Sequence, residues 1–261
     1  MRKTSAHFWF SCFLVLLLLG VVVLAQPVMG RSLLDYSNYL PYVNNPETPT
    51  PTLKPTATLT PTPTRTPLPP GVTVKPNYSS FLTSWGTLHL VGEVYNDTSS
   101  TLTNLNISVK FFDNHNKLLA TETTPLYLND LPPNDKSCFD VILSSPPKGW
   151  SSYTFSAVTY DKNGTPLPDV LFLSQSGSYD SSSGEYTIEG QVRNDDGARL
   201  ECAMIVGTLY NGSGKVIGCS YSYVSNISLS SGYTANYEVE FYGRDYHDVD
   251  AFQVQADAIK H

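Results

Sequence analysis

An internal repeat constrains the fold of this chain more than any other sequence feature. Residues 92–96 (GEVYN) are matched by residues 190–194 (GQVRN), an offset of 98 positions. The same offset carries residues 105–113 onto 203–211 without a gap. Because self-similarity at a fixed offset indicates one structural unit built more than once, the chain is predicted to contain two copies of one unit.

Each copy consists of short runs in which apolar and polar residues alternate, separated by turn residues such as those at 114–116 and 211–214. This pattern is typical of β-strands with one buried face. Along residues 105–111 the odd positions are apolar, so they are predicted to face the core, as are the odd positions of 203–209. The fold is therefore predicted to be all-β, with two tandem immunoglobulin-like antiparallel β-sandwich domains at 72–160 and 161–261.

The glycines of the second copy predict a notch in its core. With a symmetric turn over residues 211–214, Gly207 would lie opposite Gly218. A larger residue of the facing sheet would have to fill the space, and Phe241 and Tyr237 are the candidates.

The N-terminal residues predict export. Arg2 and Lys3 precede an apolar run over residues 8–25, so residues 1–25 are a signal peptide or a signal anchor. As a helix the run would span roughly 27 Å, which favours a retained membrane anchor. The alternative is secretion after cleavage near Ala25. Residues 26–71 follow as a disordered linker, since residues 46–70 hold 9 Pro and 9 Thr. Either way, the two copies are expected outside the cytoplasm.

The charge distribution argues against nucleic acid as a partner. The formal net charge is −7, and residues 161–261 hold 6 Lys/Arg against 14 Asp/Glu, a net of −8. Phosphate contacts from a basic surface supply most nucleic-acid affinity, and this chain has no basic stripe.

Both copies resemble the FxLyD domain, a bacterial and archaeal extracytoplasmic β-sandwich family. The namesake motif is matched by residues 109–113 (VKFFD) and 207–211 (GTLYN), and the flanking Gly-x-Val-x-Asn pattern occurs at 92–96 and 190–194. Both copies depart at the first motif position, where Val109 and Gly207 replace Phe, and the second copy ends in Asn211 where the motif has Asp. The resemblance covers about residues 80–160 and 170–260. It implies a fold and a location, and it supplies no catalytic or ligand-binding residues.

Three cysteines lie in the two copies, at Cys138, Cys202 and Cys219. With the symmetric turn, Cys202 would lie opposite Tyr223 and Cys219 opposite Val206. The two sulfurs would then be about 13 Å apart along the strands, too far for a bridge. We therefore expect free thiols, with a Cys202–Cys219 bridge as the alternative if a bulge shifts the register.

The sequence predicts no catalytic, cofactor-binding or metal-binding residues, and no cofactor. The histidines are scattered, so no Ser–His–Asp arrangement can be assembled from them. Acidic residues around His247 could imitate a hard-cation loop, but a solvated turn is the favoured interpretation.

One surface of the second copy is predicted to bind a partner. Outward positions of its two central strands are apolar, whereas the first copy carries polar residues at the same places. The patch consists of Met204, Val206, Tyr221 and Tyr223, with Cys202 and Cys219 on the same outer face. An apolar outer patch indicates an interface, either with the sister domain or with another molecule. The rival interpretation is that the second copy has exchanged its inner and outer faces.

Three functions compete at this level. The first is a non-enzymatic, membrane-anchored surface protein that displays two modules for adhesion, scaffolding or partner binding, its partner being a cell-surface protein or a glycan. A carbohydrate-binding module is the alternative, suggested by 17 tyrosines and 3 tryptophans. A secreted hydrolase is the third, and no converging carboxylates or nucleophile support it.

Overall fold

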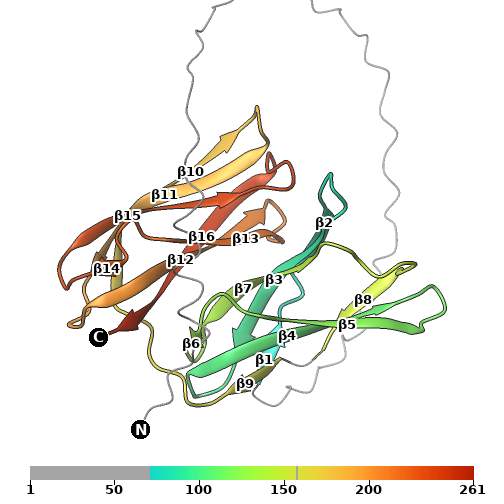
Figure 1. Ribbon diagram of the computed structural model, residues 1–261, viewed down its shortest axis with the longest axis horizontal. Coiled ribbons are helices and arrows are strands. Elements are labelled where there is room, and N and C mark those ends of the chain that lie inside the picture. The colour runs from blue at the N-terminus through green and yellow to red at the C-terminus, as the bar shows by residue number, and fades with distance from the viewer. Residues whose placement is uncertain (1–70, 157) are drawn as a thin grey trace, which may run out of the picture. The chain divides into compact units, whose positions relative to one another are not determined.

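The computed structural model describes residues 71–156 and 158–261, which form strands and connecting loops (Figure 1). The predicted export segment at 1–25 and the linker up to residue 70 lie outside this part of the chain. In the described ranges there is no helix with the length and hydrophobicity needed to cross a membrane. The all-β prediction is confirmed.

Among the described residues, the first repeat contains nine strands. They are β1 (Val72–Val74), β2 (Ser79–Leu82), β3 (Leu88–Asn96), β4 (Leu102–Phe112), β5 (Leu118–Pro125), β6 (Asp130–Leu131), β7 (Lys136–Leu143), β8 (Ser152–Phe155) and β9 (Thr159–Asp161). The second repeat contains seven. They are β10 (Val170–Asp180), β11 (Glu185–Asn194), β12 (Leu200–Asn211), β13 (Val216–Tyr223), β14 (Ser228–Leu229), β15 (Thr234–Phe241) and β16 (Val249–Lys260).

The strands form four antiparallel sheets, two in each repeat. In the first repeat, sheet A holds β1, β2 and β7 around β3, and sheet B holds β5, β6, β8 and β9 around β4. In the second repeat, sheet C has the order β10-β11-β15, and sheet D holds β13, β14 and β16 around β12. Single strands β10 and β16 therefore stand where the first repeat has the pairs β1/β2 and β8/β9.

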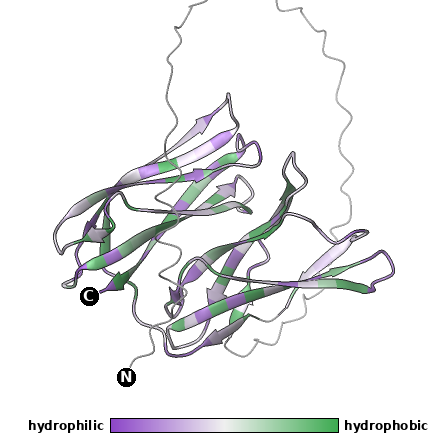
Figure 2. Cartoon of the chain, in the orientation of Figure 1, coloured by the Kyte–Doolittle hydropathy of each residue, from purple (hydrophilic) through white to green (hydrophobic). Residues whose placement is uncertain are grey.

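Each repeat encloses its own hydrophobic core between its two sheets. Hydrophobic and hydrophilic residues alternate along strands such as β4 (Figure 2). Ile107, Val109 and Phe111 are fully buried, while Lys110 between them is exposed. In the second repeat Ile205 and Leu209 belong to the core cluster. The predicted inward parity is thus confirmed in both copies, and the interpretation in which the second copy exchanged its faces is wrong.

A buried asparagine closes the same turn in each repeat, which explains the asparagine of the repeated Gly-x-Val-x-Asn pattern. The Asn96 Nδ2 donates to the carbonyl oxygens of Ser100, Leu131 and Pro132, each at 2.9 Å. The Nδ2 of Asn194 donates likewise to the carbonyl oxygens of residues 198 and 229. Because buried backbone carbonyls need partners, this side chain holds the end of the strand against the neighbouring loop.

The register predicted for the β12–β13 hairpin is wrong by two residues. Gly218 lies opposite Leu209, and Gly207 lies opposite Ser220. The turn shifts the register by one residue, because the Asn211 N–H donates to the carbonyl oxygen of Lys215, and a bulge between Leu209 and Tyr210 shifts it by another. The predicted notch nevertheless exists. A Cβ on Gly207 would lie 2.8 Å from the Phe241 ring, and one on Gly218 would lie 3.0 Å from it. Phe241 fills the notch, as one of the two predicted candidates.

Candidate functional site

The two repeats meet through the outer faces of sheets A and D, within one compact unit that spans Leu68–His261. A disulfide joins Cys138 of β7 to Cys219 of β13, with a Cα–Cα distance of 5.8 Å. Both cysteines are buried, at 1% and 6% exposure. The prediction of free thiols is therefore wrong, and Cys202 is not a free thiol either. The alternative Cys202–Cys219 bridge is also wrong, because Cys219 is bonded to Cys138.

Apolar side chains surround this disulfide. Met204 and Val206 are 5% and 1% exposed and pack against Leu128 and Cys138 of the first repeat. Tyr223 lies half-buried at the edge of the same cluster. Tyr221 remains 39% exposed, and its ring centroid lies 4.7 Å from that of Tyr127. Of the two partners left open for this patch, the sister repeat is the one that covers Met204 and Val206.

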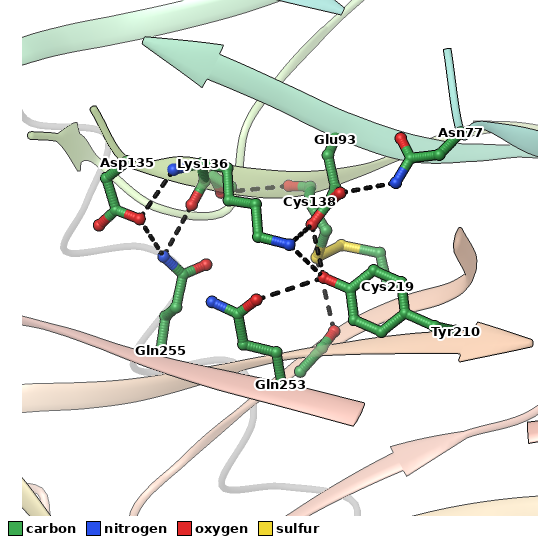
Figure 3. Close-up of polar contacts among 11 residues, drawn as sticks. Asn77, Glu93, Asp135, Lys136, Cys138, Tyr210, Cys219, Gln253 and Gln255 are labelled. Carbon is green, nitrogen blue, oxygen red and sulfur yellow. Dashed lines mark hydrogen bonds and ion pairs between the residues drawn. A yellow bond between two sulfur atoms is a disulfide. The ribbon is translucent and has the colours of Figure 1, made fainter. Parts of the chain in front are cut away.

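A buried polar network lies beside the disulfide (Figure 3). The Glu93 side chain is 3% exposed and binds Lys136 Nζ at 2.6 Å. The Tyr210 hydroxyl donates to the same carboxylate oxygen at 2.5 Å, and the Asn77 Nδ2 donates to the other oxygen at 2.8 Å. Tyr210 belongs to the second repeat and the other three residues to the first. Three donors therefore converge on one carboxylate across the boundary between repeats.

Burial and hydrogen bonding together determine the protonation states of Glu93 and Tyr210 in this network. Burial alone would raise the pKa of Glu93, but hydrogen bonds from Lys136, Tyr210 and Asn77 outweigh it, so its pKa is lowered. Burial first, and the neighbouring Glu93 carboxylate second, raise the pKa of Tyr210. Glu93 therefore stays ionised and Tyr210 stays protonated at neutral pH. Removing Lys136 would leave the buried Glu93 carboxylate without its cation, which is destabilising.

Main-chain groups add direct hydrogen bonds between the repeats. The Val216 N–H donates to the Asn77 carbonyl oxygen at 2.8 Å, and the Ser79 hydroxyl donates to the Val216 carbonyl at 2.6 Å. The Gln255 amide donates to the Lys136 carbonyl at 2.7 Å. Since main-chain groups hold fixed positions, these bonds set the register in which the two sheets meet.

A second buried carboxylate lies at the interface. Asp257 of β16 accepts hydrogen bonds from the Asn129 N–H at 2.7 Å and from its Nδ2 at 3.0 Å. Burial, the largest effect, raises the pKa of Asp257 to about 6. Asp257 therefore becomes protonated at a higher pH than an ordinary aspartate does, whereas the pKa of Glu93 is lowered.

A histidine–carboxylate pair lies on the outer face of sheet A. His89 Nδ1 lies 2.8 Å from Asp140 Oδ2, and the Phe81 ring stacks on the imidazole at 4.7 Å between centroids. Burial raises the pKa of Asp140, and His89 partly offsets this effect. The other carboxylate oxygen is buried and has no hydrogen-bond partner among residues 71–156 and 158–261. In the same ranges no hydroxyl or thiol is hydrogen-bonded to His89, so the pair lacks the third member of a nucleophilic triad.

The residues around His247 pair locally. Asp245 accepts hydrogen bonds from the Tyr179 hydroxyl and from the His247 N–H, and Asp248 binds Arg244. Within the described part of the chain, no three His, Cys, Asp or Glu side chains are grouped as metal ligands would be. Among residues 71–156 and 158–261, the most exposed large aromatic side chains are those of Trp85, Tyr233 and Tyr242, and the last two flank opposite ends of β15.

The sequence pattern singled out Met204 and Val206, which lie at this contact, and gave no sign of its polar residues. Glu93 and Lys136 alternate with inward residues just as solvated charges do, so neither signals burial. The pairing of Cys138 with Cys219 depends on how two sheets from different repeats dock. No pattern within one repeat encodes that arrangement.

Comparisons with known proteins add little. No family model and no curated protein matches the sequence. The structure of red sea bream transglutaminase is similar at 12% identity, covering 72% of this chain and 29% of that one, with a TM-score of 0.22. The exo-chitosanase of Amycolatopsis orientalis is similar at 11% identity, covering 71% and 26%, with a TM-score of 0.25. The chain thus spans less than a third of these proteins, and scores this low carry no argument about fold or function.

Proposed function

We propose that this chain is a non-enzymatic extracytoplasmic surface protein, displaying two FxLyD-like, immunoglobulin-like sandwiches as one rigid module for adhesion, scaffolding or partner binding. The observation that supports this most is the buried Cys138–Cys219 disulfide between repeats. Disulfides persist in oxidising compartments and are rare where thiols are kept reduced. A disulfide with both cysteines buried is a structural one, since reactive thiols lie in exposed, electropositive surroundings.

The contacts between repeats favour a rigid module over two loosely tethered ones. A covalent bond, an apolar cluster and an ion pair with a buried carboxylate coincide at one boundary. Domains joined by small polar contacts are expected to move relative to each other, whereas a large apolar contact suppresses such motion. A rigid spacing of two modules suits a protein that positions a partner at the surface.

The membrane anchor at residues 1–25 and the linker at 26–71 complete the proposal. With the anchor retained, the linker would hold the module away from the membrane; with cleavage near Ala25, the module would be secreted.

Surface labelling of the cells that make the protein tests this proposal. One sample of intact cells is treated with a protease, and a second sample is lysed under denaturing, non-reducing conditions in the presence of a maleimide. We expect loss of residues 72–261 to the protease and no maleimide adduct on Cys138 or Cys219. Protease resistance in intact cells, together with adducts on both cysteines after lysis, would place the protein in a reducing compartment and overturn the proposal.

A further inference from the structure

The edge strand of the second repeat offers an open hydrogen-bonding edge. β10 runs through 11 residues with one bulge between Phe172 and Ser174. It pairs with β11 on one side, and no strand in residues 71–156 or 158–261 pairs with its other side. Residues 173–180 are exposed. A long exposed edge is a ready template for an added strand, and proteins normally blunt such edges.

In the first repeat the corresponding edge is interrupted and covered, so it is not available to pair with an added strand. This edge is divided into β1 and β2 by residues 75–78, which include Pro76. The second repeat occupies the break, since the Val216 N–H donates to the Asn77 carbonyl there. One copy of this edge is therefore short and covered, and the other is continuous and open.

A polar groove of about 630 Å³ extends from this edge along β11 and β15 of sheet C to Ser222, Tyr223 and Ser225 at the end of β13. Glu189 of β11 and Glu238 of β15 lie directly opposite each other in the ladder, and both line the groove. Between them and the open edge stand Ser174 and Ser176, whose short side chains leave the passage free. No Lys or Arg is among the described residues that line it.

We propose that the β10 edge and this groove together bind an extended basic peptide by strand addition. The peptide backbone would pair with β10, and alternate side chains would then point over the outer face of sheet C. The added strand would lie roughly 10 Å from β11, a gap that a lysine and a glutamate can bridge when extended toward each other. Carboxylates without a cation of their own favour Lys or Arg at those positions.

Charge disfavours a second copy of this chain as the occupant. The second repeat carries a net charge of −8, from 6 Lys/Arg against 14 Asp/Glu, so two copies paired through β10 would bring like charges together. This inference rests on the proposed function and deepens it, because it names the partner class and the place where it binds.

Defined peptides on the purified full chain test strand addition. The probe is a decapeptide of alternating Lys and Thr, compared with its Glu–Thr counterpart and with two versions methylated on the backbone nitrogens of either all Lys or all Thr. In a strand, alternate N–H groups point to the same edge. One methylated peptide should therefore lose binding while the other keeps it. Equal affinities of the two methylated peptides would overturn strand addition.

Variants of the groove test the charge requirement. The Glu189→Gln variant should bind the Lys–Thr peptide about threefold more weakly, as expected for one exposed ion pair, whereas Glu238 lies one strand further from the added strand. The exposed Glu122→Gln of the first repeat is the matched control and should bind as the wild type does. Equal loss in the control variant would show nonspecific attraction and overturn the site.

Sedimentation velocity of the same samples distinguishes the remaining occupant. A dimer that dissociates on peptide addition would assign the edge to a second copy and overturn the basic-peptide proposal. A chain that stays monomeric without peptide supports it. Failure of these experiments removes the binding site alone, because the proposed location depends on the separate labelling of intact cells.

Discussion

Removing the Cys138–Cys219 disulfide should lower the thermal stability of the contact between the two repeats without unfolding either hydrophobic core at 25 °C. The bridge joins residues 81 positions apart, and in the chain-entropy description such a loop contributes about 4.5 kcal/mol to stability. For a folded unit of roughly 190 residues, each kcal/mol shifts Tm by about 2–4 °C, so a fall of roughly 10 °C or more is expected. The separate hydrophobic cores of the two repeats should keep the β-type circular dichroism spectrum unchanged at 25 °C.

The assay is thermal unfolding of the full chain and its Cys138→Ala/Cys219→Ala variant, without reductant. Both cysteines are replaced so that neither thiol is left unpaired in the interface. A matched control is Thr121→Ala, which alters the position of the first repeat that corresponds to Cys219 and should leave Tm within about 2 °C, as expected of a surface substitution. If the double variant melts within 1 °C of the wild type, the bridge contributes no constraint and the reasoning is refuted.

Three further changes test the packing and the buried charges. Met204→Ser should cost about 2–4 kcal/mol in urea unfolding because the side chain is buried, while Tyr221→Ser should cost under half of that; equal losses would contradict the interface. Gly207→Val should destabilise the protein by about 1–3 kcal/mol through contact with Phe241. Adding Phe241→Leu should restore stability, since the first repeat carries Val109 and Leu143 at the two equivalent positions. If the losses from the two substitutions simply add, Phe241 does not fill a space left by Gly207. Asp257→Asn should stabilise the protein at pH 7 and not at pH 4. The pKa of Asp257 is about 6 in the folded protein and 3.8 in the unfolded chain, so the stability of the wild type falls as the pH rises between these values. A stability difference that does not depend on pH would contradict this prediction.

The sequence predicted features that depend on local periodicity. The inward parity of residues 105–111 and 203–209 could be read from alternation alone, because a strand places successive side chains on opposite faces. The notch beside Phe241 could also be read, since two glycines on neighbouring strands remove volume that a facing residue must supply. Both inferences survive a register error of two residues, because such a shift preserves the face of every side chain.

Features that depend on docking could not be predicted. The turn and the bulge between Leu209 and Tyr210 place Cys219 opposite Thr208, further from Cys202 than expected, so these two cysteines are still too far apart to bond to each other. The partner of Cys219 is Cys138, on a strand of the other repeat, and nothing local to either cysteine indicates the other. Glu93 likewise resembles an ordinary outward charge until Tyr210 of the second repeat covers it.

The contact between repeats joins two different faces of the same kind of unit. Sheet A of one copy meets sheet D of the next, and a head-to-tail contact of this type propagates unless its outermost faces are changed. Asn236 of sheet C replaces Cys138 of sheet A, and Glu238 there replaces Asp140 beside it. At the other end, sheet B carries polar residues where sheet D is apolar. These are Asn106, Ser108 and Thr121, in place of Met204, Val206 and Cys219. A third copy would meet neither an apolar surface nor a thiol at either end. Head-to-tail assembly of this unit therefore stops at two copies.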